Sequence, residues 1–353
     1  MNYIGSKKRL LAFIEEKINE IVDKPVSIFC DLFAGTGVVG AFFKEKGYSL
    51  IANDLQYYSY VLNKSTLGIN TEPKFEKLTF IENSKNSKSP AENVCAYLTS
   101  LEGRKGFIYK NYAAGGTKSK EFKRTYFSDE NAKKCDDIRE KIEDWNSKNL
   151  LTDEEYFYLL ACLIQSIDLY ANTASLYGAY LKKLKKTALA TLVIKPIKII
   201  PSTKKHAIYN MDSNKLAKKI KADIFYLDPP YNHRQYGANY HILETIACMD
   251  SPKIRGKTGQ REQSDKRSSY CLKREVKKAF SELIESLDGK YIFLSYNNEG
   301  LLSLDEVKDI MSQRGEYGVF KKKYQRFKAD KDDKRVYKAK NTEEYLHYVK
   351  VRT

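Results

Sequence analysis

A glycine-rich turn between two strand-like segments constrains the fold of this chain more than any other sequence feature. Residues 26–33 form an apolar run typical of a buried strand, and residues 34–37 follow it as a tight turn. Residues 38–46 then have a helical pattern, and residues 48–52 form a second apolar run. This order predicts one β-α-β unit of a parallel sheet.

The chain changes character between residues 71 and 205. Lysine, serine and asparagine become more frequent there, and apolar side chains recur with helical spacing at residues 129–145 and 153–169. The second of these segments has a broad apolar face, which is typical of a packed helix. The stretch therefore predicts an inserted, mostly helical domain.

Strand and helix alternation resumes beyond the insertion. Residues 222–228 form an apolar strand-like run, residues 275–287 have a helical pattern, and residues 291–295 form a further strand. We therefore predict an α/β fold, with one doubly wound sheet domain made by residues 1–70 and 206–353.

Charge and cysteine content limit the partners and the compartment of the chain. Lys and Arg number 62 against 45 Asp and Glu, and this net charge of +17 favours a polyanion, nucleic acid first of all. The six cysteines form no C-x-x-C pair and lie mostly among apolar residues, which predicts reduced thiols and a cytoplasmic location. The four histidines lack metal-binding spacing, and no apolar run approaches the ~20 residues of a membrane span. We expect no metal and no membrane association.

The glycine-rich turn has features of a nucleoside site. Asp54 lies 19 residues after Gly35, close to the ~20-residue offset at which a carboxylate reaches ribose hydroxyls in doubly wound folds. The turn lacks the third glycine of a dinucleotide fingerprint and the Gly-Lys-Ser/Thr of a phosphate-binding loop. A nucleoside without phosphates, such as S-adenosylmethionine, therefore fits better than NAD or ATP. Gly35 and Gly37 would let the backbone approach its amino-acid part, Asp31 would meet its ammonium group, and Asp54 its ribose.

A second motif, Asp228-Pro229-Pro230-Tyr231, ends the apolar run that begins at residue 222. It would put a carboxylate, a carbonyl and an aromatic face at the carboxyl edge of the sheet, where open α/β sheets bind ligands. Together these groups can hold and activate an exocyclic amine of a nucleobase. Because Asp-Pro-Pro also makes an ordinary strand-ending turn, the motif alone leaves both interpretations open.

These elements together resemble the D12 class of DNA adenine-N6 methyltransferases, in its restriction-modification branch. The resemblance covers residues 1–70 and 206–353 and little of the middle. The matching motifs, in the order of the family, are Tyr3-Ile4-Gly5-Ser6-Lys7, Asp31-Leu32-Phe33-Ala34-Gly35-Thr36-Gly37, Asn53-Asp54, Tyr209-Asn210-Met211-Asp212 and Asp228-Pro229-Pro230-Tyr231. The resemblance implies a Rossmann-like sheet that uses S-adenosylmethionine and releases S-adenosylhomocysteine.

The resemblance also implies roles for the matched residues. The catalytic motif would be Asp228, Pro229, Pro230 and Tyr231. The cofactor would be bound by Tyr3, Lys7, Asp31, Phe33, Ala34, Gly35, Thr36, Gly37, Asp54, Asp212 and Asp228. Asp212 has the capping of a turn as its alternative role. The helical domain, residues 71–205, would recognise the DNA target.

The implied activity is site-specific methylation of N6 of a flipped-out adenine in double-stranded DNA. Because adenine N6 is a poor nucleophile, the Asp228 carboxylate and the Pro229 carbonyl would each accept one of its hydrogens while Tyr231 stacks on the base. Functional pairing with a cognate restriction endonuclease would follow from the restriction-modification branch. The alternatives are a cytosine-N4 methyltransferase, an RNA adenine methyltransferase and an inactive DNA-binding relative, and Asp at position 228 favours adenine over cytosine.

Further candidates lie outside the matched functional motifs. Tyr236, Tyr240 and His241 follow the Asp-Pro-Pro-Tyr motif and could line the base pocket, with a core position as the alternative for the last two. The basic loops at residues 251–269 and 321–340 could close over a charged substrate, although such runs are usually solvated faces.

Overall fold

The computed structural model describes residues 4–81, 89–262, 267–324 and 342–352. These residues divide into two compact units, each formed from segments that are far apart in the sequence. The sheet unit contains residues 4–63, 202–236, 267–324 and 342–352. The helical unit contains residues 64–201 and 237–262.

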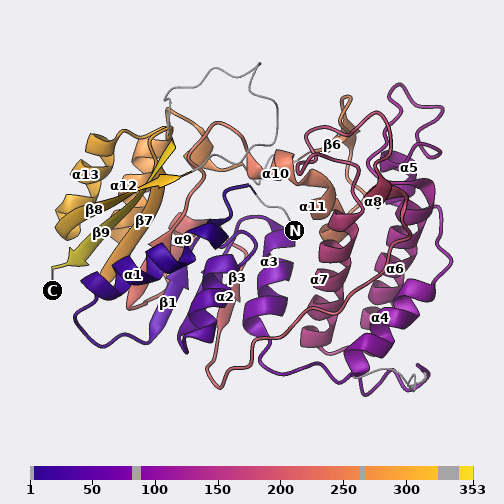
Figure 1. The fold of residues 1–353 in the computed structure, drawn as a ribbon, viewed down its shortest axis with the longest axis horizontal. Coiled ribbons are helices and arrows are strands. Elements are labelled where there is room, and N and C mark those ends of the chain that lie inside the picture. The colour runs from indigo at the N-terminus through magenta and orange to yellow at the C-terminus, as the bar shows by residue number, and fades with distance from the viewer. Residues whose placement is uncertain (1–3, 82–88, 263–266, 325–341, 353) are drawn as a thin grey trace. The chain divides into compact units, whose positions relative to one another are not determined.

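The sheet unit is built on a seven-stranded mixed sheet with the order β3-β2-β1-β4-β7-β9-β8 (Figure 1). Its strands are β1 (Ile28–Asp31), β2 (Ser49–Asn53), β3 (Ala207–Tyr209), β4 (Ile224–Leu227), β7 (Tyr291–Asn297), β8 (Gly315–Tyr324) and β9 (Thr342–Val351). The first five are parallel to one another, whereas β9 is antiparallel to both β7 and β8. The strand order reverses between β1 and β4, which is where open parallel sheets bind ligands.

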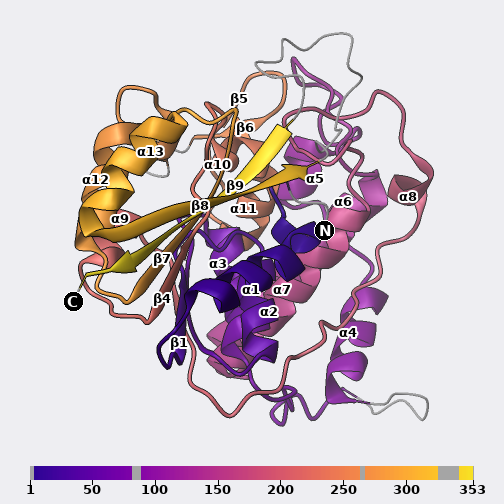
Figure 2. The same ribbon diagram turned by 60° about the vertical axis from the view of Figure 1, so that its left-hand side comes forward.

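Helices cover both faces of this sheet (Figure 2). One face carries α1 (Leu11–Ile21) and α2 (Val38–Glu45), and the other carries α9 (Ser213–Ala217), α12 (Val276–Ser286) and α13 (Leu304–Met311). On the first face the rings of Phe29 and Phe43 stack, with centroids 4.0 Å apart. On the second, Phe225 and Leu283 belong to one fully buried cluster. Because β4 and β7 are buried on both faces, β4 and residues 291–294 of β7 are continuous apolar runs.

The helical unit is organised around two long helices, α6 (Asp129–Ser147) and α7 (Asp153–Leu169). The remaining elements include α4 (Pro90–Ser100), α5 (Phe107–Tyr112), α8 (Lys186–Leu189), α11 (His241–Cys248), and a hairpin of β5 (Ile254–Arg255) and β6 (Gln260–Arg261). At the start of α7, Thr152 and Glu155 form a capping box, each side chain accepting a hydrogen bond from the backbone N–H of the other. The two long helices coincide with the helical patterns of the sequence.

The structural division differs from the sequence prediction after residue 236. Residues 237–262 follow the Asp-Pro-Pro-Tyr motif and were predicted in the sheet domain, but they pack in the helical unit. There, α11 packs against α7, and the Arg139 guanidinium donates hydrogen bonds to the carbonyl oxygens of Ile246 and Ala247. The chain therefore returns to the helical unit once more before it completes the sheet.

Tyr240 and His241 lie within this returning segment and are fully buried. His241 Nε2 lies 3.0 Å from the carbonyl oxygen of Tyr177, and burial lowers the pKa of His241 to about 4. The imidazole is therefore neutral and its Nε2 carries the proton. Both residues have the core position that the sequence left as the alternative.

Three general expectations can be compared with the described part of the chain. All six cysteines are free thiols, and five of them are buried. Among the described residues, no cluster of His, Cys, Asp or Glu could hold a metal ion. No helix in these same ranges has both the length and the apolar character needed to cross a membrane.

Candidate active site

A cavity of about 250 Å³ opens in the sheet unit where β1 and β4 end. Most of the residues that the sequence predicted for the site line it: Lys7, Asp31, Phe33, Ala34, Gly35, Thr36, Asp54, Asp212, Asp228 and Pro230. They come from five separate parts of the sequence. The strand order brings them together, because β1 lies between β2 and β4.

The glycine-rich turn is fixed to the end of β2 by Asp54. One carboxylate oxygen of Asp54 accepts a hydrogen bond of 2.9 Å from the N–H of Gly35, and the other accepts one of 2.8 Å from the N–H of Gln56. Gly35 and Gly37 have φ angles of +52° and +76°, a backbone region that costs other residues roughly 1–2 kcal/mol. A carboxylate oxygen can accept more than one hydrogen bond, so these contacts are compatible with a ribose hydroxyl at Asp54.

The cavity is acidic. Asp31, Asp54 and Asp228 line it from neighbouring strand ends, with Lys7 beside them. Burial, together with the negative charges of Asp228 and Asp54, raises the pKa of Asp31 well above its usual value. A bound cation would relieve this repulsion, whereas phosphate groups would increase it.

The donor set therefore fits a cationic nucleoside such as S-adenosylmethionine. Besides the carboxylates, the fully buried Tyr226 also lines the cavity. Burial and the negative charge of Asp228 raise the pKa of Tyr226 well above its usual value, so its hydroxyl stays protonated and can donate a hydrogen bond.

Asp212 has the local role that the sequence gave as its alternative. It is the N-cap of α9, and its side chain accepts a hydrogen bond of 3.0 Å from the N–H of Lys215. It also lines the cavity. The cap fixes the carboxylate at the cavity edge, so the two roles are compatible.

Asp228 is half-buried and belongs to a charge cluster with Lys7 and Glu344. Its Oδ1 atom lies 2.9 Å from Nζ of Lys7, which begins the short helix η1 (Lys7–Arg9). The same Nζ lies 3.1 Å from Oε1 of Glu344 on β9, and that Oε1 also accepts a hydrogen bond of 2.7 Å from the hydroxyl of Ser295 on β7. Lys7 and Glu344 are 5% and 4% exposed, which makes this cluster part of the protein interior.

The environment of Asp228 changes its acidity. Burial raises its pKa and Glu344 adds to this effect, while Lys7 opposes it, with the net result a pKa of about 6. Asp228 is therefore mostly ionised at neutral pH, and its pKa lies only about one pH unit below neutral pH.

Four predicted site residues are placed differently or fall outside the structure. Three of them, which the structure does describe, do not line the cavity: Gly37, Pro229 and Tyr231. The Tyr231 ring instead lies edge-on to Tyr296, with centroids 6.1 Å apart, and 5.8 Å from Lys7 Nζ. Tyr3 lies outside the described residues.

Several residues of the site were missed by the sequence interpretation. Tyr226, Gln235 and Ser268 line the cavity, and the side-chain amide of Gln235 exchanges two hydrogen bonds with the backbone of Ser268. Period-two alternation along β4 was an available signal for Tyr226, because residues 226 and 228 share a face. Nothing local in the sequence marks Glu344.

This combination of fold and cavity is that of a Rossmann-like, S-adenosylmethionine-dependent methyltransferase. A family model described as D12 class N6 adenine-specific DNA methyltransferase matches residues 3–310. The chain belongs to this family.

Similar proteins agree with this family. The chain is 46% identical to Type II methyltransferase M.NlaIII of Neisseria lactamica, over 98% of each protein. It is 39% identical to Type II methyltransferase M.FokI of Planomicrobium okeanokoites, over 99% of this chain and 52% of that protein. A solved SAM-dependent methyltransferase from Agrobacterium tumefaciens aligns with 97% of this chain and 61% of its own length, at 12% identity and a TM-score of 0.31, too distant a likeness to add to the assignment.

Membership of the D12 class defines the reaction and the substrates. The chain is a DNA methyltransferase specific for adenine N6, and S-adenosylmethionine is its methyl donor. Its nucleic-acid partner is DNA.

Proposed function

We propose that Asp228 and Pro229 activate the target adenine in this chain and that the acidic cavity binds the methyl donor beside it. The observation that supports this most directly is the position of the Asp228 carboxylate, at the end of β4 and in the same cavity as the glycine-rich turn after β1. Neighbouring strand ends of this kind can hold two substrates within the ~3–3.5 Å that a direct displacement needs.

The chemistry required of the protein is modest. The ionised Asp228 carboxylate accepts one hydrogen of the N6 amine and the Pro229 carbonyl accepts the other, which favours a pyramidal nitrogen with an available lone pair. S-adenosylmethionine supplies a methyl group activated by its sulfonium. As positive charge develops on N6, the fixed negative charge of Asp228 stabilises it without reorganisation.

The remaining cavity residues provide the binding site for the donor. Asp31 faces its ammonium group, Asp54 its ribose, and the backbone at Gly35 its amino-acid part. Asp212, fixed by its cap, is suited to the adenine end. The target adenine itself is rotated out of the duplex, at a cost of a few kcal/mol that phosphate contacts offset.

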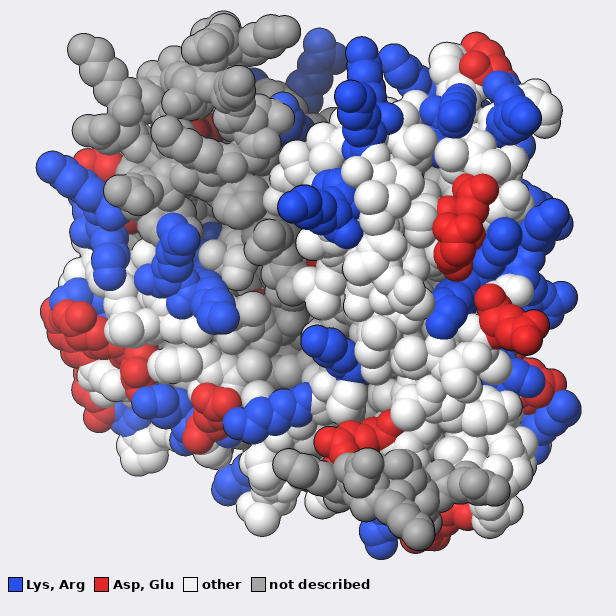
Figure 3. All heavy atoms as spheres, turned by 45° about the vertical axis from the view of Figure 1, so that its right-hand side comes forward, with Lys and Arg blue, Asp and Glu red and all other residues white. Residues whose placement is uncertain are grey.

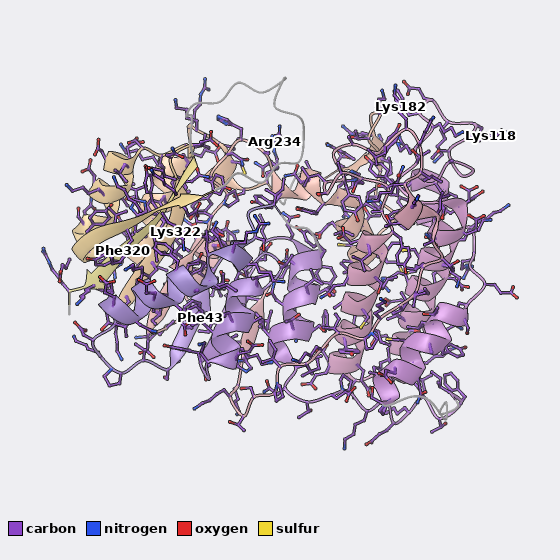
Figure 4. The ribbon with its side chains drawn as sticks, in the orientation of Figure 1. Phe43, Lys118, Lys182, Arg234, Phe320 and Lys322 are labelled. Atoms are coloured by element: carbon purple, nitrogen blue, oxygen red, sulfur yellow. The ribbon has the colours of Figure 1, made fainter. Side chains whose placement is uncertain are left out.

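The helical unit is the proposed DNA-recognition domain, now including residues 237–262. Two of its loops are tied together, because the Tyr180 hydroxyl donates to the Lys123 carbonyl and the Thr125 hydroxyl donates to the Leu181 carbonyl. Their exposed lysines are Lys118, Lys120, Lys123, Lys182 and Lys183. Figure 4 labels Lys118 and Lys182, which lie close together at one end of the helical unit. Figure 3 shows Lys and Arg side chains gathered at the same end.

The β5–β6 hairpin adds a rigid element to the same unit. The Arg124 guanidinium donates hydrogen bonds to the carbonyl oxygens of Gly256 and Lys257. The hydroxyls of Tyr126 and Tyr112 bind the next two carbonyls along the turn. These hydrogen bonds fix the backbone of the hairpin turn, while the side chain of Lys257 is exposed. A preformed β-ribbon of this kind is suited to a DNA groove.

The biological setting proposed for the chain is a restriction-modification system in the cytoplasm. M.NlaIII and M.FokI, two of the similar proteins, are both named Type II methyltransferases. By this analogy the chain protects host DNA from a cognate restriction endonuclease. Digestion of DNA from cells that express the chain, with a panel of endonucleases, tests this part by the appearance of one resistant recognition sequence.

The variant Asp228→Ala tests the catalytic assignment. We expect it to retain DNA affinity and donor binding while the rate of methyl transfer falls by at least about a hundredfold. Single-turnover transfer of a labelled methyl group measures the rate, and calorimetry with S-adenosylmethionine measures binding. Asp305→Ala, which removes an exposed carboxylate from the first turn of α13, is the matched control. Turnover by Asp228→Ala close to that of the native chain would reject the assignment.

A further inference from the structure

A buried carboxylate far from Asp228 in sequence contacts the same lysine. Glu344 Oε1 lies 3.1 Å from Lys7 Nζ and accepts a hydrogen bond of 2.7 Å from the Ser295 hydroxyl. Glu344 and Ser295 are 4% and 2% exposed. Burying a carboxylate is unfavourable unless it is paired and hydrogen-bonded, and here both conditions are met. Glu344 is not among the described residues that line the cavity, so it acts on the reacting groups through its contact with Lys7 and through its charge near Asp228.

Lys7 is held between two carboxylates. Burial alone would lower its pKa, but the negative charges of Asp228 and Glu344 outweigh burial, and the pKa of Lys7 lies well above its usual value. The lysine is therefore a cation that gives one N–H to Asp228 and directs another at Glu344. With all three groups ionised, the cluster has one net negative charge.

This net negative charge is important because Asp228 is proposed to act on the N6 amine of the target adenine. A lysine paired with Asp228 alone would neutralise its charge and would compete with the N6 hydrogens for its oxygens. Because Glu344 shares the ammonium, one oxygen of Asp228 is fixed by Lys7 while the negative field at the carboxylate persists. Positive charge grows on N6 during the transfer, so the field is needed there.

We propose that Glu344, held by Ser295, is a positioning residue that fixes Lys7 against Asp228 and leaves Asp228 a strong acceptor for the target amine. The inference rests on the function proposed for Asp228. It assigns to β9, the antiparallel strand of the sheet, a part in catalysis at the ends of the parallel strands.

The variant Glu344→Gln tests the charge without removing the side chain. The amide oxygen of glutamine can still accept the hydrogen bond from Ser295. We expect kcat to fall about tenfold or more, while KM for DNA and for S-adenosylmethionine stays unchanged. Glu343→Gln is the matched control: its carboxylate is one residue away and binds the Tyr345 hydroxyl, and its kinetics should equal those of the native chain.

The pH profile distinguishes this role from simple packing. Among the described residues, the charged and titratable groups around Asp228 and its partner Lys7, which lies on η1, are Asp31 on β1, Tyr226 on β4, Tyr231 after β4 and Glu344 on β9. Glu344 raises the pKa of Asp228 and Lys7 lowers it. Removing the charge of Glu344 should therefore move the acid limb of the rate to lower pH even as the plateau falls. Glu344→Asp keeps the charge and should leave the limb where it is.

The outcomes separate the possible failures. Native kcat together with a native acid limb in Glu344→Gln would overturn the inference, as would a lower kcat with an unmoved limb. If Glu344→Gln does not fold, Ser295→Ala provides the test: kcat should fall several-fold with the limb unmoved, and native kcat would overturn the inference. Absence of methyl transfer by the native chain would instead reject the proposed function.

Discussion

The residues proposed to bind the two substrates differ in their electrostatic surroundings. Asp31 and Asp54 are fixed at the ends of β1 and β2, where their charges suit a cationic donor. Asp228 lies on the next strand, where Lys7 partly balances its charge. In the proposed site, a cationic donor beside Asp31 would therefore lower the raised pKa of that carboxyl, whereas Lys7 already counters the charge of Asp228 before the neutral amine binds.

The acidity of Asp228 predicts the pH dependence of the reaction. Its pKa of about 6 results from burial and Glu344, opposed by Lys7. Only the ionised form accepts the N6 hydrogen, so kcat/KM should fall about tenfold for each pH unit below about pH 6. Measuring kcat/KM of the free enzyme across this range checks the prediction. A profile that stays flat well below pH 6, with the protein still folded, would contradict the role of the carboxylate.

Asp54 should matter for the turn as well as for the ligand. In Asp54→Ala the N–H groups of Gly35 and Gln56 lose their acceptors, and each loss costs about 1–3 kcal/mol if water does not replace it. We expect a lower free energy of unfolding and weaker binding of S-adenosylmethionine. Chemical denaturation and calorimetry measure the two effects. Native donor affinity in a destabilised variant would leave Asp54 a structural residue only.

At the scale of elements, the hairpin of β5 and β6 depends on side chains that come from a different part of the helical unit. Arg124 is 6% exposed, and its guanidinium donates to carbonyl oxygens of Asn111, Gly256 and Lys257. A hairpin with two residues in each strand is not stable alone. Its conformation is therefore imposed by the side chains of Arg124, Tyr112 and Tyr126.

Replacement of Arg124 by methionine should release the hairpin. Several hydrogen bonds from a charged donor are lost, each contributing about 1.5–3 kcal/mol when buried. We expect faster amide exchange at residues 256–261 and weaker DNA binding, with donor affinity unchanged. Arg104→Met removes an arginine that is exposed and pairs with Glu140, and it is the matched control. Native exchange rates in Arg124→Met would show that the hairpin holds itself.

The elements with local sequence signals are those that could be predicted from the sequence. The β-α-β unit, α6, α7 and the strand before Asp228 have local signals: apolar runs, helical spacing and turn residues. Asp54 and Asp228 end such strands, so their meeting at one sheet edge follows from topology. Glu344 reaches Lys7 because β9 pairs with β7, which places Glu344 opposite Asn297. A pairing between residues so far apart in the sequence has no local signal. The placement of residues 237–262 in the helical unit depends in the same way on contacts with α7 and Arg139.

At the scale of the whole molecule, the net charge of +17 should make DNA binding strongly dependent on salt. The affinity should fall by about 0.9 log units per log unit of salt for each phosphate that is neutralised. Donor binding, in a small acidic cavity, should change little. Fluorescence anisotropy across a salt series measures the slope. Lys118→Glu and Lys182→Glu should each reduce it by about one, and an unchanged slope in both would move the DNA surface elsewhere.

The most direct test of the whole account is the identity of the methylated base. Duplex DNA is incubated with the chain and S-adenosylmethionine whose methyl group is isotopically labelled, then digested to nucleosides and measured by mass spectrometry. We predict label in N6-methyldeoxyadenosine, and none when Asp228→Ala replaces the native chain. Label in N4-methyldeoxycytidine, no label in any nucleoside, or equal labelling by Asp228→Ala would contradict the account.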